Sequence, residues 1–357
     1  MSVTIPLHRD HFPPTPRLIA RAGGTEVHGF SYASGVEALV IQTPRGYVTV
    51  LPFMGQMIWD AVFDGVDLCM GNAFRQPLSA TEIAQTYGCF AFHSGLLRNG
   101  VPGPQDNHAA HGEMPTARMD SATLILDDAA VTLCGEYEYV MGFGAHYMAR
   151  PHVRLGAADT VVDMGMAVEN LSAAPMDLMY MAHVNFAFVP GGRIHQPAPF
   201  TPDRTRVRRA VPAHVTPNPA YLALIDRLAS DPAAMQVLDQ PDQYDPEQVF
   251  YIDAPAVDAE GQTHLMLERP EGDGFVLSYA PVQFPRLVRW VLNGGDAQVA
   301  AFALPATCEP EGYNAEKAKG NVQLLAPGAE AVFTTRMGYV TAQDVPALAA
   351  MIAGLKG

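Results

Sequence analysis

One segment of the sequence places a histidine and an amide in an otherwise apolar stretch. Residues 179–188 read MYMAHVNFAF, with His183 and Asn185 two positions apart. In a β-strand, such residues point to the same face. Buried polar groups cost free energy unless they are paired. The pair is therefore either a satisfied part of the core or an acid–base histidine at the floor of a cleft, with Asn185 orienting it or its ligand.

A second segment is dense in hydrogen-bonding side chains. Residues 92–115 read FHSGLLRNGVPGPQDNHAAHGEMP, and their donors and acceptors are His93, Arg98, Asn99, Gln105, Asp106, Asn107, His108, His111 and Glu113. Long loops are often functional, and this one suits a sugar, which offers many hydroxyls. The alternatives are a solvated loop, or a metal site in which His108 and His111 converge on one ion with Asp106, His93 or Glu113.

Charge and motifs remove several classes of function. The 357 residues include 37 acidic and 22 basic side chains, a net charge of −15. Such a chain repels phosphate backbones, so we expect no nucleic-acid partner. We interpret the one dense basic cluster as a solvated loop; it consists of Arg204, Arg206, Arg208 and Arg209. No GxGxxG, Walker, HExxH or GxSxG motif is present, which argues against the simplest nucleotide-binding, metalloprotease and hydrolase functions.

Cysteine usage and hydropathy indicate the compartment. The four cysteines lie far apart without a CxxC pair, which is unlike a disulfide framework or a structural zinc site. Residues 1–14 contain no apolar signal-peptide core, and no apolar run approaches the ~20 residues of a membrane span. We expect a cytoplasmic protein without a membrane partner.

The elements that must position these residues are mainly strands. The 31 glycines and 30 prolines separate many short apolar segments, which is typical of an all-β protein. Strict alternation over 131–139 and 162–168 predicts strands with one buried face. Similar segments predict strands at about 37–43, 47–53, 147–155, 176–188, 249–253, 264–268, 274–280, 287–292, 298–304 and 331–339.

Helical patterns are few. Ser79 followed by Glu82 resembles a capping box, and apolar stripes predict helices over 220–229 and 341–355. We predict a single domain over 1–357: one large antiparallel β-sandwich with short peripheral helices, a 1–36 N-terminal extension and a 341–357 C-terminal helix.

The motifs also resemble a known family. YMAHVNFAF looks like the strand that carries the catalytic histidine in the galactose mutarotase-like (aldose 1-epimerase) superfamily. The resemblance is closest to a branch known mainly as a domain of unknown function, and it covers roughly residues 38–338. Motifs similar to those of that branch are Ser94-Gly95-Leu96, His111-Gly112, 249–262 (VFYIDAPAVDAEGQ), Trp290, Leu304-Pro305-Ala306-Thr307-Cys308 and Leu325-Ala326-Pro327-Gly328.

This resemblance implies a β-supersandwich with a sugar cleft and a mechanism without a cofactor. A glutamate removes the proton of the anomeric hydroxyl, a histidine protonates the ring oxygen, and the opened sugar closes to the other anomer. By motif match, His183 takes the acid role and His111 is the second histidine of the sugar site.

The chain departs from the family at two places. The family's glutamate corresponds to Leu304, and an RGxD-like turn corresponds to residues 54–57, MGQM. The base would then come from another carboxylate, for which Glu309 is our candidate; the others are Glu311, Asp106 and Glu113. We expect the substrate-binding residues to be Asn185, Arg98, His93, Asp106, His108 and Trp290.

We therefore expect an enzyme of the aldose 1-epimerase type that acts on a specialised carbohydrate, with no cofactor and no metal. The alternatives are a catalytically silent carbohydrate-binding protein and a metal-assisted sugar isomerase or epimerase. The partner would be a small-molecule carbohydrate, and the chain could form a homodimer.

Overall fold

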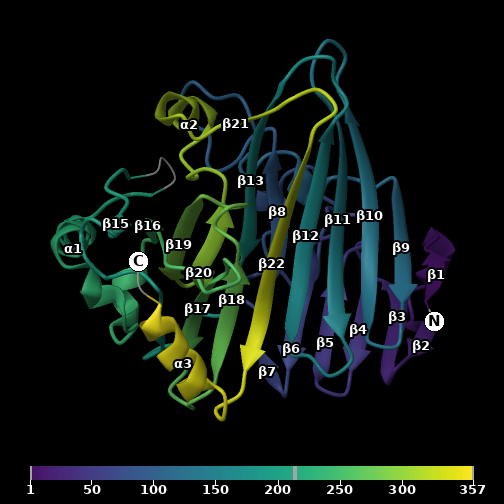
Figure 1. The fold of residues 1–357 in the computed structure, drawn as a ribbon, viewed down its shortest axis with the longest axis horizontal. Helices are drawn as coiled ribbons and strands as arrows, with labels where there is room; N and C mark the ends of the chain where they lie inside the picture. Colours follow the sequence, from purple (N-terminus) through teal and green to yellow (C-terminus); the bar gives the residue numbers. More distant parts are fainter. Residues whose placement is uncertain (1, 212–214, 356–357) are drawn as a thin grey trace.

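The structure is a computed structural model that describes residues 2–211 and 215–355. Two large antiparallel sheets dominate these residues (Figure 1). The nine-stranded sheet has the order β1 (Val3–Pro6), β9 (Ser121–Leu126), β10 (Ala130–Val140), β11 (His146–Gly156), β12 (Val161–Asn170), β22 (Glu330–Val340), β18 (Gly274–Tyr279), β17 (Thr263–Glu268) and β14 (Arg193–His195).

The second sheet has 13 strands and carries the histidine segment. Its order is β15 (Thr205–Val207), β16 (Gln248–Ile252), β19 (Arg286–Asn293), β20 (Gln298–Ala306), β13 (Met176–Val184), β8 (Ala91–Leu96), β6 (Ile58–Phe63), β5 (Gly46–Val50), β4 (Glu37–Thr43), β3 (Thr25–Ser31) and β2 (Arg17–Ala22). The short strands β21 (Gln323–Leu325) and β7 (Val66–Asp67) pair with β13 and β6. The prediction of an all-β antiparallel sandwich is confirmed.

The main core lies between the two sheets. Alternate residues of β13, including Tyr180, Ala182 and Val184, pack there with Phe275 and Phe333 of the nine-stranded sheet. The intervening residues of β13 face the opposite side, because side chains alternate along a strand. A separate apolar cluster covers that outer side, with Met181, Val249, Val288 and Leu304 among its members.

Helices are short and peripheral. They are α1 (Pro219–Ser230), α2 (Tyr313–Lys319) and α3 (Val345–Gly354), with the single 3₁₀ turns η1 (Arg9–His11), η2 (Ile83–Gln85), η3 (Met114–Thr116), η4 (Pro232–Met235) and η5 (Pro241–Tyr244). The helices expected at 220–229 and 341–355 correspond to α1 and α3. The sequence analysis missed α2.

Two expectations about local structure need comment. The capping box at Ser79 is wrong, since the turn η2 begins after Glu82 and has no side-chain cap. Residues 1–36, expected to be an extension, contribute strands to both sheets: β1 pairs with β9, and β2 and β3 continue the 13-stranded sheet.

Candidate functional site

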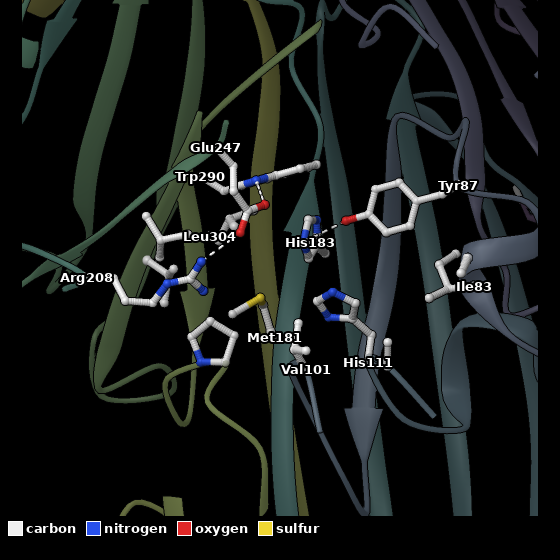
Figure 2. A pocket seen from close by; sticks show the side chains of 15 residues that line it. Ile83, Tyr87, Val101, His111, Met181, His183, Arg208, Glu247, Trp290 and Leu304 are labelled. Atoms are coloured by element: carbon white, nitrogen blue, oxygen red, sulfur yellow. Dashed lines mark hydrogen bonds and ion pairs between the residues drawn. The ribbon is translucent and has the colours of Figure 1, made fainter. Parts of the chain in front are cut away.

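A cavity of about 350 Å³ opens on the outer face of the 13-stranded sheet. Its floor is formed by strands β16, β19, β20 and β13. Its walls come from η2, the loop 100–112 and Pro310. The size is within the usual range for small-molecule sites. The lining residues are Ile83, Ala84, Tyr87, Val101, Ala110, His111, Met181, His183, Arg208, Glu247, Val249, Val288, Trp290, Leu304 and Pro310 (Figure 2).

The register of β8 against β13 determines which histidine reaches this cavity. His183 pairs with Phe92, and Ala182 pairs with His93. His183 and Phe92 therefore share the outer face, where their rings stack at 4.5 Å. His93 faces the core between the sheets, and its Nδ1 lies 2.7 Å from the Tyr180 hydroxyl.

His183 lies at the floor of the cavity and is only 3% exposed. Its Nε2 is 3.1 Å from the Tyr87 hydroxyl (Figure 2). Burial lowers the pKa of His183 well below its usual value, and nearby His111 lowers it further. The Asn185 side chain opposes this shift and raises the pKa. The imidazole is therefore neutral at neutral pH.

His111 enters the cavity from a constrained loop. It has a positive φ of 62°, and Gly112 follows with a φ of 76°. A Cβ on Gly112 would lie 2.1 Å from the carbonyl oxygen of Arg98. Only glycine therefore fits beside His111. The loop is tied to strand β8 by the hydrogen bond from the Gly95 amide to the His111 carbonyl, 2.9 Å long.

A hydrogen-bond chain sets the tautomer of His111. The Ser94 hydroxyl donates its proton to the Asn99 side-chain oxygen. Since that proton is used, the Nδ1 of His111, 3.0 Å from the same hydroxyl, must be the donor to Ser94. The Nε2 of neutral His111 therefore carries a lone pair. Burial lowers the pKa of His111 to about 4, so this acceptor persists at neutral pH.

The carboxylate of the cavity belongs to Glu247, directly before β16. One of its oxygens is 2.7 Å from Nη2 of Arg208, and the other is 2.6 Å from Nε1 of Trp290. The side chains of Arg208 and Glu247 are 8% and 13% exposed. Charge-assisted bonds of this length fix the orientation of a carboxylate. Each carboxylate oxygen has two lone pairs, so a bond to Arg208 or Trp290 does not by itself prevent it from accepting a proton.

An irregularity in β19 helps to form this side of the cavity. The register against β20 shifts between Val288 and Trp290. Both of these residues line the cavity. Arg289 between them is fully buried, and its Nε donates to the Phe302 carbonyl over 2.9 Å.

The polar groups form two sets that the Trp290 ring connects. Glu247 and Arg208 lie on one side of the cavity, and Tyr87, His183 and His111 lie on the other (Figure 2). Trp290 donates to Glu247, and its ring centroid is 5.9 Å from those of Tyr87 and His183. A carboxylate and a histidine that line the same cavity can move protons onto and off two different atoms of a ligand.

Several residues predicted from the polar loop serve to hold that loop. Asp106 accepts hydrogen bonds from the Gly103 amide at 2.8 Å and the Asn314 amide at 3.0 Å. The Nδ1 of His108 lies 2.8 Å from the Ala109 carbonyl. The Arg98 guanidinium stacks 3.7 Å above the Tyr313 ring. None of these three predicted substrate-binding residues lines the cavity described here.

Three other predicted residues also lie elsewhere. His93 faces the inter-sheet core. Asn185 is fully buried, donates to the Cys89 carbonyl over 3.0 Å, and supports His183 from behind. Glu309 lines a neighbouring cavity, where it pairs with Arg206 at 3.2 Å and Lys319 at 2.6 Å. Of the predicted site residues, only His183, His111 and Trp290 line the cavity.

The other carboxylates considered as bases are also occupied. Glu113 accepts from the amides of Leu96 and Leu97 at 3.0 and 2.9 Å. Glu311 accepts from the Tyr251 hydroxyl. These bonds hold the backbone and a neighbouring ring, which explains why the two acids are present without lining the cavity.

Sequence reasoning missed Glu247, Arg208 and Tyr87. Interpreting the basic cluster as a solvated loop was wrong for Arg208, whose side chain is nearly buried against Glu247. One signal could have found the acid. Glu247 lies two residues before Val249, so the predicted strand at 249–253 would place both on one face.

Of the two departures from the family pattern, Leu304 belongs to the cavity and the 54–57 turn does not. Gln56 is fully buried, and its side-chain nitrogen lies close to Gly135 of β10. No group of three or more His, Cys, Asp and Glu side chains within residues 2–211 and 215–355 is arranged to hold a metal ion. In the same residues, no helix is long and apolar enough to cross a membrane.

Comparison with solved structures identifies the class of fold as galactose mutarotase-like. A Klebsiella pneumoniae protein described as a "putative aldose 1-epimerase" superposes with a TM-score of 0.82 at 16% identity, covering 100% of this chain and 96% of the other. Galactose mutarotase-like proteins from Clostridium acetobutylicum and Lactobacillus casei give TM-scores of 0.59 and 0.54 at 10% and 13% identity. They cover 88% and 85% of this chain, and 98% and 99% of their own.

Within this class, the chain belongs to the DUF4432 family, described as a domain of unknown function, whose model matches residues 33–338. This confirms the suspected superfamily and branch. The search of curated proteins found no match.

Proposed function

We propose that this protein is an aldose 1-epimerase-type enzyme that interconverts the anomers of a small carbohydrate, with Glu247 as the base and His183 as the acid. The observation that carries the proposal is the position of the Glu247 carboxylate across the cavity from His183 and His111 (Figure 2). The mutarotase-like fold supports the same class of chemistry but does not specify the sugar.

In the proposed reaction, the anomeric hydroxyl lies against Glu247 and the ring oxygen faces His183. His183, neutral at rest, first takes up a proton from solvent, and the ring oxygen replaces the Tyr87 hydroxyl at its Nε2. The carboxylate accepts the hydroxyl proton while the protonated imidazole delivers its proton to the ring oxygen, and the C1–O bond of the ring breaks. The C1–C2 bond rotates in the open aldehyde, and reversal of the proton transfers closes the ring to the other anomer. The sum of bonds and protons is unchanged, so no external reactant is needed.

The surrounding residues prepare these two groups. Arg208 and Trp290 orient the carboxylate, with bonds of 2.7 and 2.6 Å. The Tyr87 hydroxyl on the Nε2 of His183 fixes the imidazole. Because burial lowers the pKa of His183, the protonated imidazole is a minor form at neutral pH, and this form is a strong acid that gives up its proton readily. The lone pair on His111 Nε2 accepts a hydrogen bond from a neighbouring hydroxyl.

A second candidate function is a carbohydrate-binding protein without catalysis. The observation that favours it is Leu304, an apolar residue of the cavity at the position where the resemblance implied the glutamate. It differs from the first candidate in one measurable property, the exchange of anomers.

The test is two-dimensional exchange NMR of anomeric protons, with the purified protein and a panel of aldoses. Exchange above the uncatalysed rate is expected for at least one sugar. Ligand-induced shifts in the protein spectrum without faster exchange would favour the binding protein. Neither binding nor exchange across aldoses, ketoses and uronic acids would contradict both functions.

A further inference from the structure

Most of the cavity lining is apolar. Nine of the 15 lining residues are aliphatic, proline or methionine: Ile83, Ala84, Val101, Ala110, Met181, Val249, Val288, Leu304 and Pro310. The six remaining residues are the polar and aromatic residues described above. A ligand must therefore offer hydroxyls to two sides and carbon to the rest.

Much of the hydrogen-bonding capacity of the polar residues is already used. The single N–H of Trp290 bonds to Glu247, and the Tyr87 hydroxyl is paired with His183. The groups that can still bond to a ligand include the other N–H groups of Arg208, the Nε2 of His111 and the second hydrogen-bonding role of the Tyr87 hydroxyl. A hexose with its full set of hydroxyls would bury some of them without a partner.

The apolar wall has a defined place relative to the reacting atoms. Met181 precedes His183 by two residues on the same face of β13, and it pairs with Ala306 of β20. Leu304 precedes Ala306 by two residues, so antiparallel pairing brings it toward His183. Val288 pairs with Leu304 from the other side. The wall made of Met181, Leu304 and Val288 is therefore adjacent to the proposed acid.

The position of this wall selects one carbon of the sugar. If His183 protonates the ring oxygen, the exocyclic carbon C6 is only two bonds away, attached to C5. In an ordinary hexose, C6 carries a hydroxyl, which the wall cannot pair. In a 6-deoxyhexose, C6 is a methyl group, which the wall can bury favourably.

We propose that the substrate of this cavity is a 6-deoxyhexose, bound with its C6 methyl against Met181, Leu304 and Val288. The inference rests on the proposed function, because the position of C6 follows from the placement of the ring oxygen at His183. It explains the aliphatic side chain of Leu304, and it names a narrower substrate class than the small carbohydrate of the proposed function.

The charges of the cavity also favour a neutral group at C6. Arg208 is the one Lys or Arg among the described lining residues, and it is paired with Glu247. A uronic acid or sugar phosphate would bring an anion to a cavity whose cation already has a carboxylate partner. A neutral methyl group has no such requirement.

The test compares matched pairs of the same configurational series that differ only at C6: D-fucose with D-galactose, D-quinovose with D-glucose and L-rhamnose with L-mannose. Exchange NMR gives kcat/KM for each sugar. We expect at least one deoxy sugar to exceed its parent by about 10- to 100-fold, the range that an apolar pocket achieves against an added hydroxyl. Equal rates, or faster exchange of every parent sugar, would overturn the inference and leave the proposed function intact. No exchange with any of the six sugars would overturn the inference, and exchange of another sugar of the wider panel would still support the proposed function.

Substitutions in the wall of Met181, Leu304 and Val288 provide a second test. In Leu304→Gln an amide could pair with a C6 hydroxyl, so we expect the preference to shift at least tenfold toward the parent sugar. Leu304→Met is the matched control, and it should keep the wild-type ratio. Met181→Gln makes the same test from β13 if Leu304→Gln fails to fold. An unchanged ratio in a folded glutamine variant would contradict the position assigned to C6.

Discussion

Replacing Glu247 with glutamine tests the base directly. Glutamine has nearly the same shape and can still accept the Trp290 N–H, which lies 2.6 Å from the carboxylate. It cannot accept a proton at neutral pH. Positioned general acid–base groups contribute a factor of ~10²–10⁴, so we expect kcat/KM for anomer exchange to fall by that factor.

The same change also affects folding, and the two effects must be separated. Arg208, 2.7 Å from Glu247, has a side chain only 8% exposed. Removal of one partner from a buried ion pair costs about 3–5 kcal/mol, and the slight exposure places Glu247→Gln at or below the lower end. Urea unfolding measures this loss. Anomer exchange is then measured at urea-free conditions where circular dichroism shows the variant to be folded.

Glu309→Gln is the matched control for Glu247→Gln. Glu309 is also a shielded carboxylate with cationic partners, Arg206 at 3.2 Å and Lys319 at 2.6 Å, but it lines the neighbouring cavity. We expect reduced stability and unchanged exchange. If a folded Glu247→Gln variant exchanged anomers at the wild-type rate, or if Glu309→Gln alone abolished exchange, the assignment of the base would be refuted.

Three further predictions concern the histidines and the loop that supports one of them. His183→Ala should lower kcat/KM by ~10²–10⁴ with the fold intact by circular dichroism; a folded variant with an unchanged rate would remove His183 from the mechanism. Gly112→Ala should strongly reduce sugar binding in NMR titrations, because its Cβ would meet the Arg98 carbonyl oxygen at 2.1 Å and displace the loop that carries His111. Gly328→Ala is the control: its φ is also positive, 70°, but no atom lies within 4 Å of the added Cβ, so only stability should change. Equal effects of the two variants on binding would contradict the role of Gly112 in holding this loop. Burial lowers the pKa of His93 to about 3, so the side chain is neutral in the fold and takes up a proton on unfolding. Its contribution to stability is complete above pH ~6.5 and is lost as the pH falls toward 3, by roughly 1 kcal/mol per pH unit. In urea unfolding between pH 6.5 and 4.5, the free energy of unfolding of His93→Phe should depend less steeply on pH than that of the wild type, and an identical slope would count against the buried neutral state.

The strands of the fold were predictable because their signal is local. Alternation over 131–139 and 162–168 corresponds to β10 and β12. The same period-two reasoning placed His183 on a strand face, and the structure places it in a cavity. The helix α2 lacks a comparable local signal, since it is only seven residues long and begins after Gly312 without a side-chain cap.

The polar loop shows why composition alone overestimates a site. In the structure residues 92–96 of this segment belong to strand β8 and the loop itself is 97–113, which must satisfy its own backbone before it can bind a ligand. Asp106 and Glu113 are used for that purpose, through bonds to the Gly103 and Leu96 amides. Of the residues predicted there, only His111 turns into the cavity, and it does so through a left-handed backbone at His111 and Gly112 that sequence spacing does not reveal.

Glu247 could not be singled out because its role depends on long-range pairing. Its partners are Arg208, 39 residues before it, and Trp290, 43 residues after it. They meet because β15 and β19 are the two neighbours of β16 in the sheet. From the sequence alone, Glu247 is one of many acidic residues in a proline-containing turn before a strand.

The position of this carboxylate connects the proposed mechanism with the proposed specificity. The resemblance implied a glutamate at position 304 on β20, whereas the carboxylate of the cavity belongs to Glu247, directly before β16, with β19 between the two strands. If the base acts from Glu247, a second carboxylate at position 304 is unnecessary. It would also add an unpaired buried charge beside the neutral His183. An aliphatic residue there avoids that cost and at the same time provides the wall against which a methyl group can bind. On this reasoning, Leu304 results from the relocation of the base, and it need not indicate that catalysis was lost.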